Sequence, residues 1–264
     1  MELTALLYAL GGTAFTFAMT CVGSATVFLF RGRPTALATK LSLGFAAGIM
    51  IGASVWSLLL PAMDMAASQG QAPALPAVLG FILGAGFLMA LDNAMPHLHP
   101  LSQQAEGPRT HLHRHSLLFL AITIHNIPEG MAVGIAFVAA ITSPGTEGLT
   151  SALALALGMG IQNIPEGAAV SLPLHSSGSS RARAFAMGVV SGLVEPLAAV
   201  LTVMLAFVFL PVMPYLLSFA AGAMFYVVIE ELLPAAKLGE HSDMGTLSVL
   251  SGFLIMMLLD TSLV

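Results

Sequence analysis

Eight long apolar stretches constrain this chain most, because only a membrane offers apolar surroundings for all of them. They lie at about 3–30, 41–64, 73–95, 116–141, 149–174, 184–210, 213–236 and 244–263. Each contains the roughly 20 residues that a helix needs to cross a bilayer. Hydrophobic residues make up 57% of the 264 residues and charged residues 8%, whereas a soluble domain carries about a quarter charged residues. We therefore expect an all-α polytopic membrane protein with eight transmembrane helices.

The connections between these stretches are short, apart from a polar loop at about 96–116. We therefore expect a single transmembrane domain over residues 1–264. Cys21 is the only cysteine, which excludes a disulfide framework and a cysteine metal site. The first apolar stretch follows Met1 and Glu2 without a basic region before it, so we expect no removed signal peptide.

Every Lys and Arg of the chain falls in an odd-numbered connection. The first, third, fifth and seventh connections carry, in order, Arg31, Arg33 and Lys40, then Arg109 and Arg114, then Arg181 and Arg183, and finally Lys237. Short loops rich in Lys and Arg stay in the cytoplasm. The pattern predicts that the odd-numbered loops are cytoplasmic and that both termini are extracellular or periplasmic.

Stretches in the two halves of the chain resemble each other in pairs. The second and seventh share Phe-Ala-Ala-Gly-x-Met followed by Leu-Leu-Pro-Ala, beginning at Phe45 and Phe219. The third and eighth share Gly-Phe-Leu and a later Asp, beginning at Gly86 and Gly252. In the expected topology the members of each pair cross the membrane in opposite directions, as do the fourth and fifth stretches. We predict an inverted repeat (3+2+3), which is typical of transporters with a midplane site.

Two near-identical hexapeptides lie in the fourth and fifth stretches, His-Asn-Ile-Pro-Glu-Gly at 125–130 and Gln-Asn-Ile-Pro-Glu-Gly at 162–167. In a helix the first residue and the Glu four places later share one face. Pro128 and Pro165 lack a backbone N–H, so they free the carbonyls of Ile124 and Ile161. Charge inside a membrane is costly and usually functional. Imidazole, carboxylate, amide and carbonyl groups together predict an intramembrane site for a divalent metal ion.

Further candidates lie in other stretches. Glu195 precedes Pro196 in the sixth stretch, and we favour a ligand role over a structural one. Met50 fits packing and thioether ligation equally well. Near the outer end of the second stretch, Ser57 and Asp64 either attract entering cations or form a solvated helix end. We expect Asp260 to be only a boundary residue.

Polar residues near the cytoplasmic ends suggest a release path of weaker ligands: Asp92, His97, His99, Glu230 and Glu231. For the two Glu residues a solvated helix end is the competing interpretation. The third loop also contains His111, His113 and His115, and such alternating histidines can collect metal ions.

The paired motifs resemble those of the ZIP (Zrt-, Irt-like protein) family of metal transporters, in particular its bacterial GufA-like members. The resemblance covers the whole chain, including the histidine-containing third loop. It implies inward transport of Zn²⁺ across the plasma membrane, which is the inner membrane in a bacterium. It also implies a binuclear centre between the fourth and fifth helices. The ligands carried over from the family motifs are His125, Asn126, Glu129, Gln162, Asn163, Glu166, Glu195 and Met50.

Some relatives carry Asp at the position of Asn163, so the resemblance implies a weaker second metal position here. Charge agrees, because ionised Glu129 and Glu166 balance one divalent ion and adding Glu195 does not balance two. The same donors accept Zn²⁺, Fe²⁺, Mn²⁺, Co²⁺ and Cd²⁺. The expected partners are these ions and the lipid bilayer, without nucleic acid, and a homodimer stays open.

Other classes of function fit less well. An intramembrane metalloprotease needs His-Glu-x-x-His, which the sequence lacks. A membrane di-iron enzyme needs several Glu-x-x-His repeats, and only one intramembrane histidine is present in the motifs. We therefore expect no enzyme. A broad-specificity transporter and a channel-like metal permease stay open alternatives.

Overall fold

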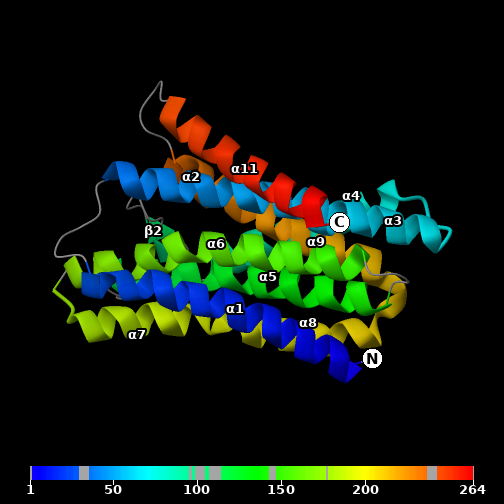
Figure 1. Ribbon diagram of the computed structural model, residues 1–264, viewed down its shortest axis with the longest axis horizontal. Coiled ribbons are helices and arrows are strands. Elements are labelled where there is room, and N and C mark those ends of the chain that lie inside the picture. Colours follow the sequence, from blue (N-terminus) through cyan, green and yellow to red (C-terminus); the bar gives the residue numbers. More distant parts are fainter. Residues whose placement is uncertain are drawn as a thin grey trace.

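The computed structural model describes residues 2–29, 36–94, 97–98, 105–106, 114–142, 147–176, 178–236 and 243–263 (Figure 1). Its helices are α1 Glu2–Leu29, α2 Ala36–Ala53, η1 Ser54–Leu59, α3 Leu60–Ser68, α4 Ala74–Ala94, α5 Arg114–Thr142, α6 Glu147–Ser176, α7 Arg181–Gly192, α8 Val194–Val208, η2 Leu210–Val212, α9 Met213–Val227, η3 Val228–Leu232, α10 Leu233–Ala236 and α11 Asp243–Leu263. The segments η1 and η3 are π-helical and η2 is a short 3-10 turn. The expected all-helical membrane class is confirmed for the described residues, apart from one two-residue strand pair.

Seven helical segments are long and apolar enough to cross a membrane, namely Glu2–Leu29, Lys40–Ser68, Ala74–Ala94, Thr123–Thr142, Arg181–Val208, Met213–Leu232 and Asp243–Ser262. The remaining expected crossing, 149–174, forms the 30-residue helix α6. That helix is long enough, but the polar residues of its hexapeptide lower its hydropathy. The eighth crossing therefore stays a prediction.

The strands β1 (His97–Leu98) and β2 (Ala105–Glu106) pair antiparallel in the loop after α4, with His97 opposite Glu106. Strand β1 lies against α5. His115 lies in the first turn of α5. The other loop histidines of the sequence prediction, His99, His111 and His113, lie outside the described residues.

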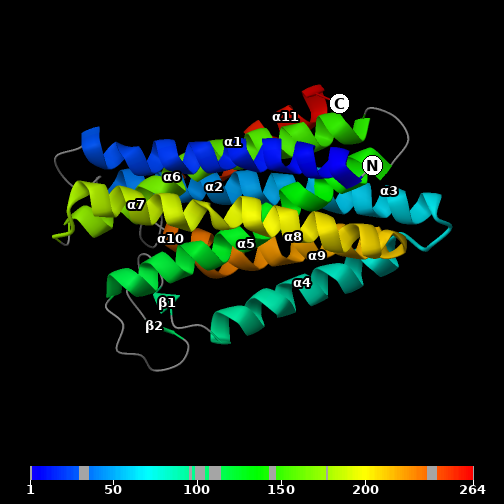
Figure 2. The same cartoon turned by 90° about the horizontal axis from the view of Figure 1, so that it is seen from below.

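Helices α5 and α6, which carry the two hexapeptides, lie in the middle of the bundle (Figure 1). On one side α1, α7 and α8 pack against them, and on the other lie α2, α9 and α11. Helix α4 lies at the edge, against α9 (Figure 2). Helix α6 keeps an exposed apolar face with Leu153, Leu157 and Ile161, but the polar side chains of the hexapeptides, such as Glu129 and Gln162, are buried between helices.

Two helix pairs pack through glycines that allow backbones to touch. A Cβ atom added to Gly48 of α2 would lie 2.0 Å from the carbonyl oxygen of Val249, and one added to Gly252 of α11 would lie 2.0 Å from that of Phe45.

Helices α4 and α9 make the same kind of contact. A Cβ atom at Gly84 would lie 1.9 Å from the backbone oxygen of Phe219, and one at Gly222 would lie 2.0 Å from that of Phe81.

By these close contacts, the third and eighth stretches match in another register than by their shared Gly-Phe-Leu. The glycine of α4 that packs as Gly252 does is Gly84, which meets a backbone oxygen of its own neighbouring helix, whereas a Cβ atom at Gly86 would meet no atom within 4 Å. With this register, Asp92 and Asp260 each follow their packed glycine by eight residues. Sequence similarity alone favoured Gly86, since only that glycine precedes Phe-Leu.

Candidate metal centre

The last glycine of each hexapeptide brings a neighbouring helix close to the motif. A Cβ atom at Gly130 would lie 2.2 Å from the carbonyl oxygen of Glu195, and one at Gly167 2.2 Å from that of Thr20. Helix α8 therefore presses on α5, and α1 presses on α6, at the same position of each motif. This contact fixes Glu195 beside the first hexapeptide. The sequence signal for it was the shared final glycine.

One side-chain contact joins the two hexapeptides directly. The amide nitrogen of Gln162 donates a 2.8 Å hydrogen bond to Oε1 of Glu129. Both side chains are buried, with Glu129 1% and Gln162 0% exposed. Glu166 is buried as well. Met50 is fully buried among core residues of the bundle, which fits packing and ligation alike, so its ligand role stays a prediction.

Glu195 forms a second polar cluster with α1 and α6. Its Oε2 accepts a 2.5 Å hydrogen bond from Thr16, and its Oε1 accepts one of 2.8 Å from the amide of Asn163 and a longer one of 3.4 Å from Thr20. Thr16 and Thr20 were not among the site residues predicted from the sequence. The available signal was a row of buried hydroxyl residues at helical spacing along α1: Thr13, Thr16, Thr20 and Ser24.

His125 and Asn126 face different neighbours. The Nε2 atom of His125 lies 3.9 Å from Oε1 of Glu231 in η3. The amide of Asn126 donates a 2.8 Å hydrogen bond to the backbone oxygen of Ser191, near the end of α7. Among the predicted release residues, Glu231 is therefore next to the first residue of a hexapeptide.

The other described release residues differ in burial and in their neighbours. Asp92 is buried and accepts a 3.2 Å hydrogen bond from the hydroxyl of Tyr226 on α9. Glu230 is exposed, so the solvated helix end describes it well. Its neighbour Glu231 is buried, and the same description does not fit it.

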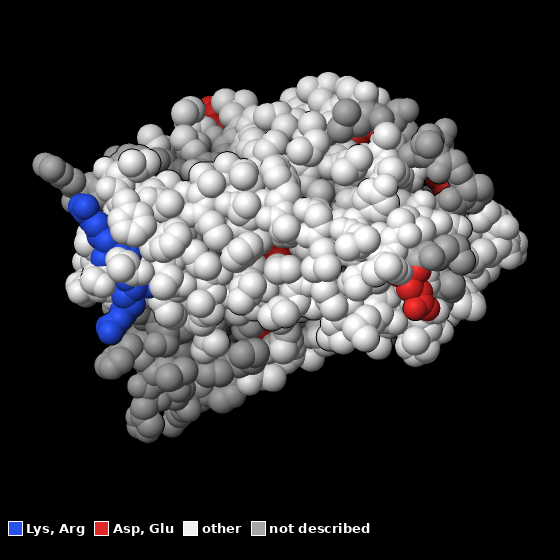
Figure 3. Space-filling view, turned by 60° about the horizontal axis from the view of Figure 1, so that its bottom comes forward, with Lys and Arg blue, Asp and Glu red and all other residues white. Residues whose placement is uncertain are grey.

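Four side-chain oxygens of the hexapeptides are buried without a hydrogen-bond partner among the described residues: Oδ1 of Asn126, Oε2 of Glu129, Oε1 of Gln162 and Oδ1 of Asn163. Leaving such an atom without a partner costs about 1–3 kcal/mol each. The described Lys and Arg side chains gather at one end of the molecule, away from these residues (Figure 3). A cation at the motifs would satisfy these oxygens, and the donor set of oxygens with one imidazole suits a divalent metal ion.

The described side chains do not form a closed metal site. No group of three or more His, Cys, Asp and Glu residues within the described ranges converges on one point. Instead, the amide of Gln162 donates to Glu129 and that of Asn163 donates to Glu195. The predicted ligand set therefore stays a prediction.

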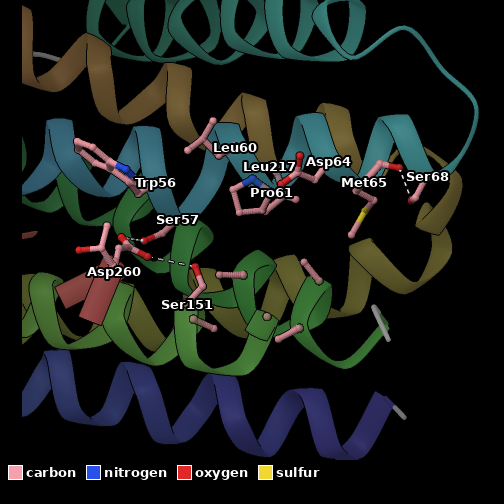
Figure 4. A pocket seen from close by; sticks show the side chains of 16 residues that line it. Trp56, Ser57, Leu60, Pro61, Asp64, Met65, Ser68, Ser151, Leu217 and Asp260 are labelled. Atoms are coloured by element: carbon pink, nitrogen blue, oxygen red, sulfur yellow. Dashed lines mark hydrogen bonds between the residues drawn. The ribbon is translucent and has the colours of Figure 1, made fainter. Parts of the chain in front are cut away.

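A cavity of about 580 Å³ opens at the end of the bundle opposite the Lys and Arg residues (Figure 4). Ser57, Asp64 and Asp260 line it. The expectation that Asp260 is a boundary residue is wrong: it is 4% exposed and accepts hydrogen bonds from Ser57 (2.7 Å) and Ser151 (3.3 Å). Both donors come from parts of the chain far from Asp260 in sequence, so its position did not suggest them.

Long apolar helices around buried carboxyl and amide groups define a multi-pass membrane protein with a polar centre. Residues 114–260 match the family described as ZIP zinc transporter. The chain is 37% identical to human zinc transporter ZIP11 over 97% of both chains. It is 37% identical to zinc transporter GufA of Myxococcus xanthus over 83% of this chain and 85% of GufA. It is 38% identical to zinc transporter ZIPB of Bordetella bronchiseptica over 97% of this chain and 81% of ZIPB.

This chain therefore belongs to the ZIP family, and it is a transporter rather than an enzyme. The resemblance expected from the paired hexapeptides, including the GufA-like relatives, is confirmed.

Proposed function

We propose that this protein carries divalent metal ions, with Zn²⁺ as the favoured substrate, across the plasma membrane toward the cytoplasm. The buried oxygens without partners in the two hexapeptides carry this proposal, because a cation bound between α5 and α6 would give a partner to Oε2 of Glu129 and Oε1 of Gln162. Relatives of the chain are named zinc transporters. The donor set also accepts Fe²⁺, Mn²⁺, Co²⁺ and Cd²⁺, so competition among these ions is part of the test.

The order of polar groups along α5 supports a path for the ion. Ala136, Ala139 and Ala140 of α5 line the 580 Å³ cavity. Glu129 lies about two to three helical turns before them, and His125, beside Glu231, lies about one turn further. The helix begins at Arg114, at the basic end. The positive-inside rule makes that end cytoplasmic, so an ion that follows these groups from the cavity moves inward.

An inverted repeat of 3+2+3 helices with both termini outside accounts for the paired contacts. Gly48 and Gly222 occupy equivalent positions, as do Gly84 and Gly252, and each makes the same backbone contact. In the two hexapeptides, Gly130 and Gly167 lie equally close to the backbone of a neighbouring helix, Gly130 at Glu195 and Gly167 at Thr20. The π-helical segments also match, since η1 begins six residues after Gly48 and η3 six residues after Gly222.

The test is Zn²⁺ uptake into vesicles that contain the purified protein. Glu129→Ala and Glu166→Ala should each remove most uptake, because each deletes a buried carboxylate of the site. Glu2→Ala, at an exposed acid in the first turn of α1, is the matched control and should transport normally. Saturable uptake in the micromolar range supports a carrier, and uptake that rises without saturation supports a channel-like permease. Normal uptake by both motif variants would contradict the proposed site.

A further inference from the structure

Glu195 differs from the motif carboxylates in how its oxygens are bound. Both of its carboxylate oxygens accept hydrogen bonds from side chains of this chain, from Thr16 at Oε2 and from Asn163 and Thr20 at Oε1. In contrast, Oε2 of Glu129 is buried and has no partner among the described residues. The hydrogen-bonding demand of Glu195 is therefore met by protein, and that of Glu129 is not.

The amide group of Asn163 has only one orientation that suits its neighbours. Its nitrogen lies 2.8 Å from Oε1 of Glu195 and 3.2 Å from the backbone oxygen of Thr16. Both neighbours are acceptors, so the NH₂ group must face them and both of its hydrogens are used. The remaining oxygen, Oδ1, is buried without a donor.

We infer that Thr16 and Asn163 give Glu195 the contacts that a second metal ion would otherwise give, so that the centre holds a single divalent ion at His125, Glu129, Gln162 and Glu166. This inference rests on the proposed function. Thr16 lies on α1, outside both hexapeptides, and it acts as a positioning residue that holds the Glu195 carboxylate toward α1 rather than toward the ion.

Charge explains why position 163 matters. An Asp there would lose both N–H donors and would place a second carboxylate beside Glu195. Two buried carboxylates in contact repel each other, and a bridging divalent ion relieves that repulsion. An Asn bridges the same distance with a neutral N–H group, so it needs no ion.

Thr13 offers a matched control for Thr16. Both threonines are fully buried on α1. The hydroxyl of Thr13 donates a 2.7 Å hydrogen bond to Ala9 of its own helix and to no carboxylate. A Thr→Val change replaces the hydroxyl with a methyl group of similar size at either position, but only at position 16 does it remove a hydrogen bond to Glu195.

The experiment is an equilibrium Zn²⁺ titration of the purified protein, with the bound metal measured after dialysis. The parent should bind one ion per chain. Asn163→Asp should add a weaker second ion. Thr16→Val in the same background should tighten binding of that second ion about tenfold, because the Thr16 hydroxyl no longer competes with the ion for the Glu195 carboxylate. Thr16→Ser, which keeps the hydroxyl, and Thr13→Val should leave the second ion weak.

Two equally tight ions in the parent would overturn the inference, and so would equal effects of Thr16→Val and Thr13→Val. Uptake measurements separate this inference from the proposed function. Normal Zn²⁺ uptake with two tight ions in the parent contradicts only the inference. A parent that binds one ion but transports none contradicts the proposed function and leaves the single-ion centre supported.

Discussion

Ser57 donates a hydrogen bond of 2.7 Å from its hydroxyl to the carboxylate of Asp260, and this contact ties η1 to the last turns of α11. Ser151, near the start of α6, donates a longer bond of 3.3 Å to the other oxygen of the same carboxylate. Three segments that are distant in sequence thus meet at one buried acid on the wall of the cavity. The acid is held in place where the proposed path begins.

Replacing Asp260 with Asn should weaken metal capture from the cavity. The change keeps the size of the side chain but removes a charge that burial shields from solvent. We expect the Zn²⁺ concentration for half-maximal uptake to rise about fivefold, which corresponds to roughly 1 kcal/mol. Asp64→Asn is the control, because Asp64 lines the same cavity but is exposed, where salt and water screen its charge. Equal changes for the two variants would show that Asp260 has no special role in capture.

Adding a methyl group at the motif glycines should destabilise the bundle. In Gly130→Ala and Gly167→Ala the new Cβ atom would lie 2.2 Å from a backbone oxygen of the neighbouring helix, so that helix must move. Overpacking of this kind costs about 1–3 kcal/mol, which should appear as a lower thermal unfolding midpoint in detergent.

Gly86→Ala is the control for these variants, because its Cβ atom would meet nothing within 4 Å. Alanine also has a higher helix propensity than glycine by up to about 1 kcal/mol. The midpoint should stay the same or rise. A fall as large as that of Gly130→Ala would mean that helix contacts at the motif are not the cause.

Local sequence patterns predicted the helical membrane class and a polar site at the two hexapeptides. Both the long apolar stretches and the repeated polar residues are visible along the chain. The side-chain contacts of Glu195 and of the cavity acid Asp260 are not visible in this way. Thr16 reaches Glu195 across 179 positions of sequence, and Ser57 reaches Asp260 across 203. Such pairs depend on which helices pack together and in what register.

Two neighbouring residues show most directly that burial could not be predicted from the sequence alone. Glu230 and Glu231 look equivalent in sequence, yet one is exposed and the other is buried beside His125. Adjacent positions on a helix point about 100° apart, and the π-helical turn η3 shifts the faces further. The sequence did not indicate that turn.

The expected orientation can be tested by labelling single cysteines. In a Cys21→Ser background, Ser68→Cys lies in an exposed position at the end of α3, and Ser179→Cys lies in the turn before α7. The distribution of Lys and Arg predicts that position 68 is outside and position 179 is cytoplasmic. A membrane-impermeant maleimide should label the first in intact cells and the second only after permeabilisation. Labelling of position 179 in intact cells would contradict the orientation.

The contact between His125 and Glu231 predicts which acid takes part in metal release. Glu231→Gln removes a buried charge 3.9 Å from the imidazole, and loss of a charge at such a site should lower maximal uptake by at least about tenfold. Glu230→Gln makes the same chemical change at the exposed neighbour and should leave uptake unchanged. Because Glu129 and Glu166 remain, the Glu231 variant should still bind one Zn²⁺ per chain in an equilibrium titration. Lost binding would place Glu231 among the ligands of the centre, and unchanged uptake would remove it from the path.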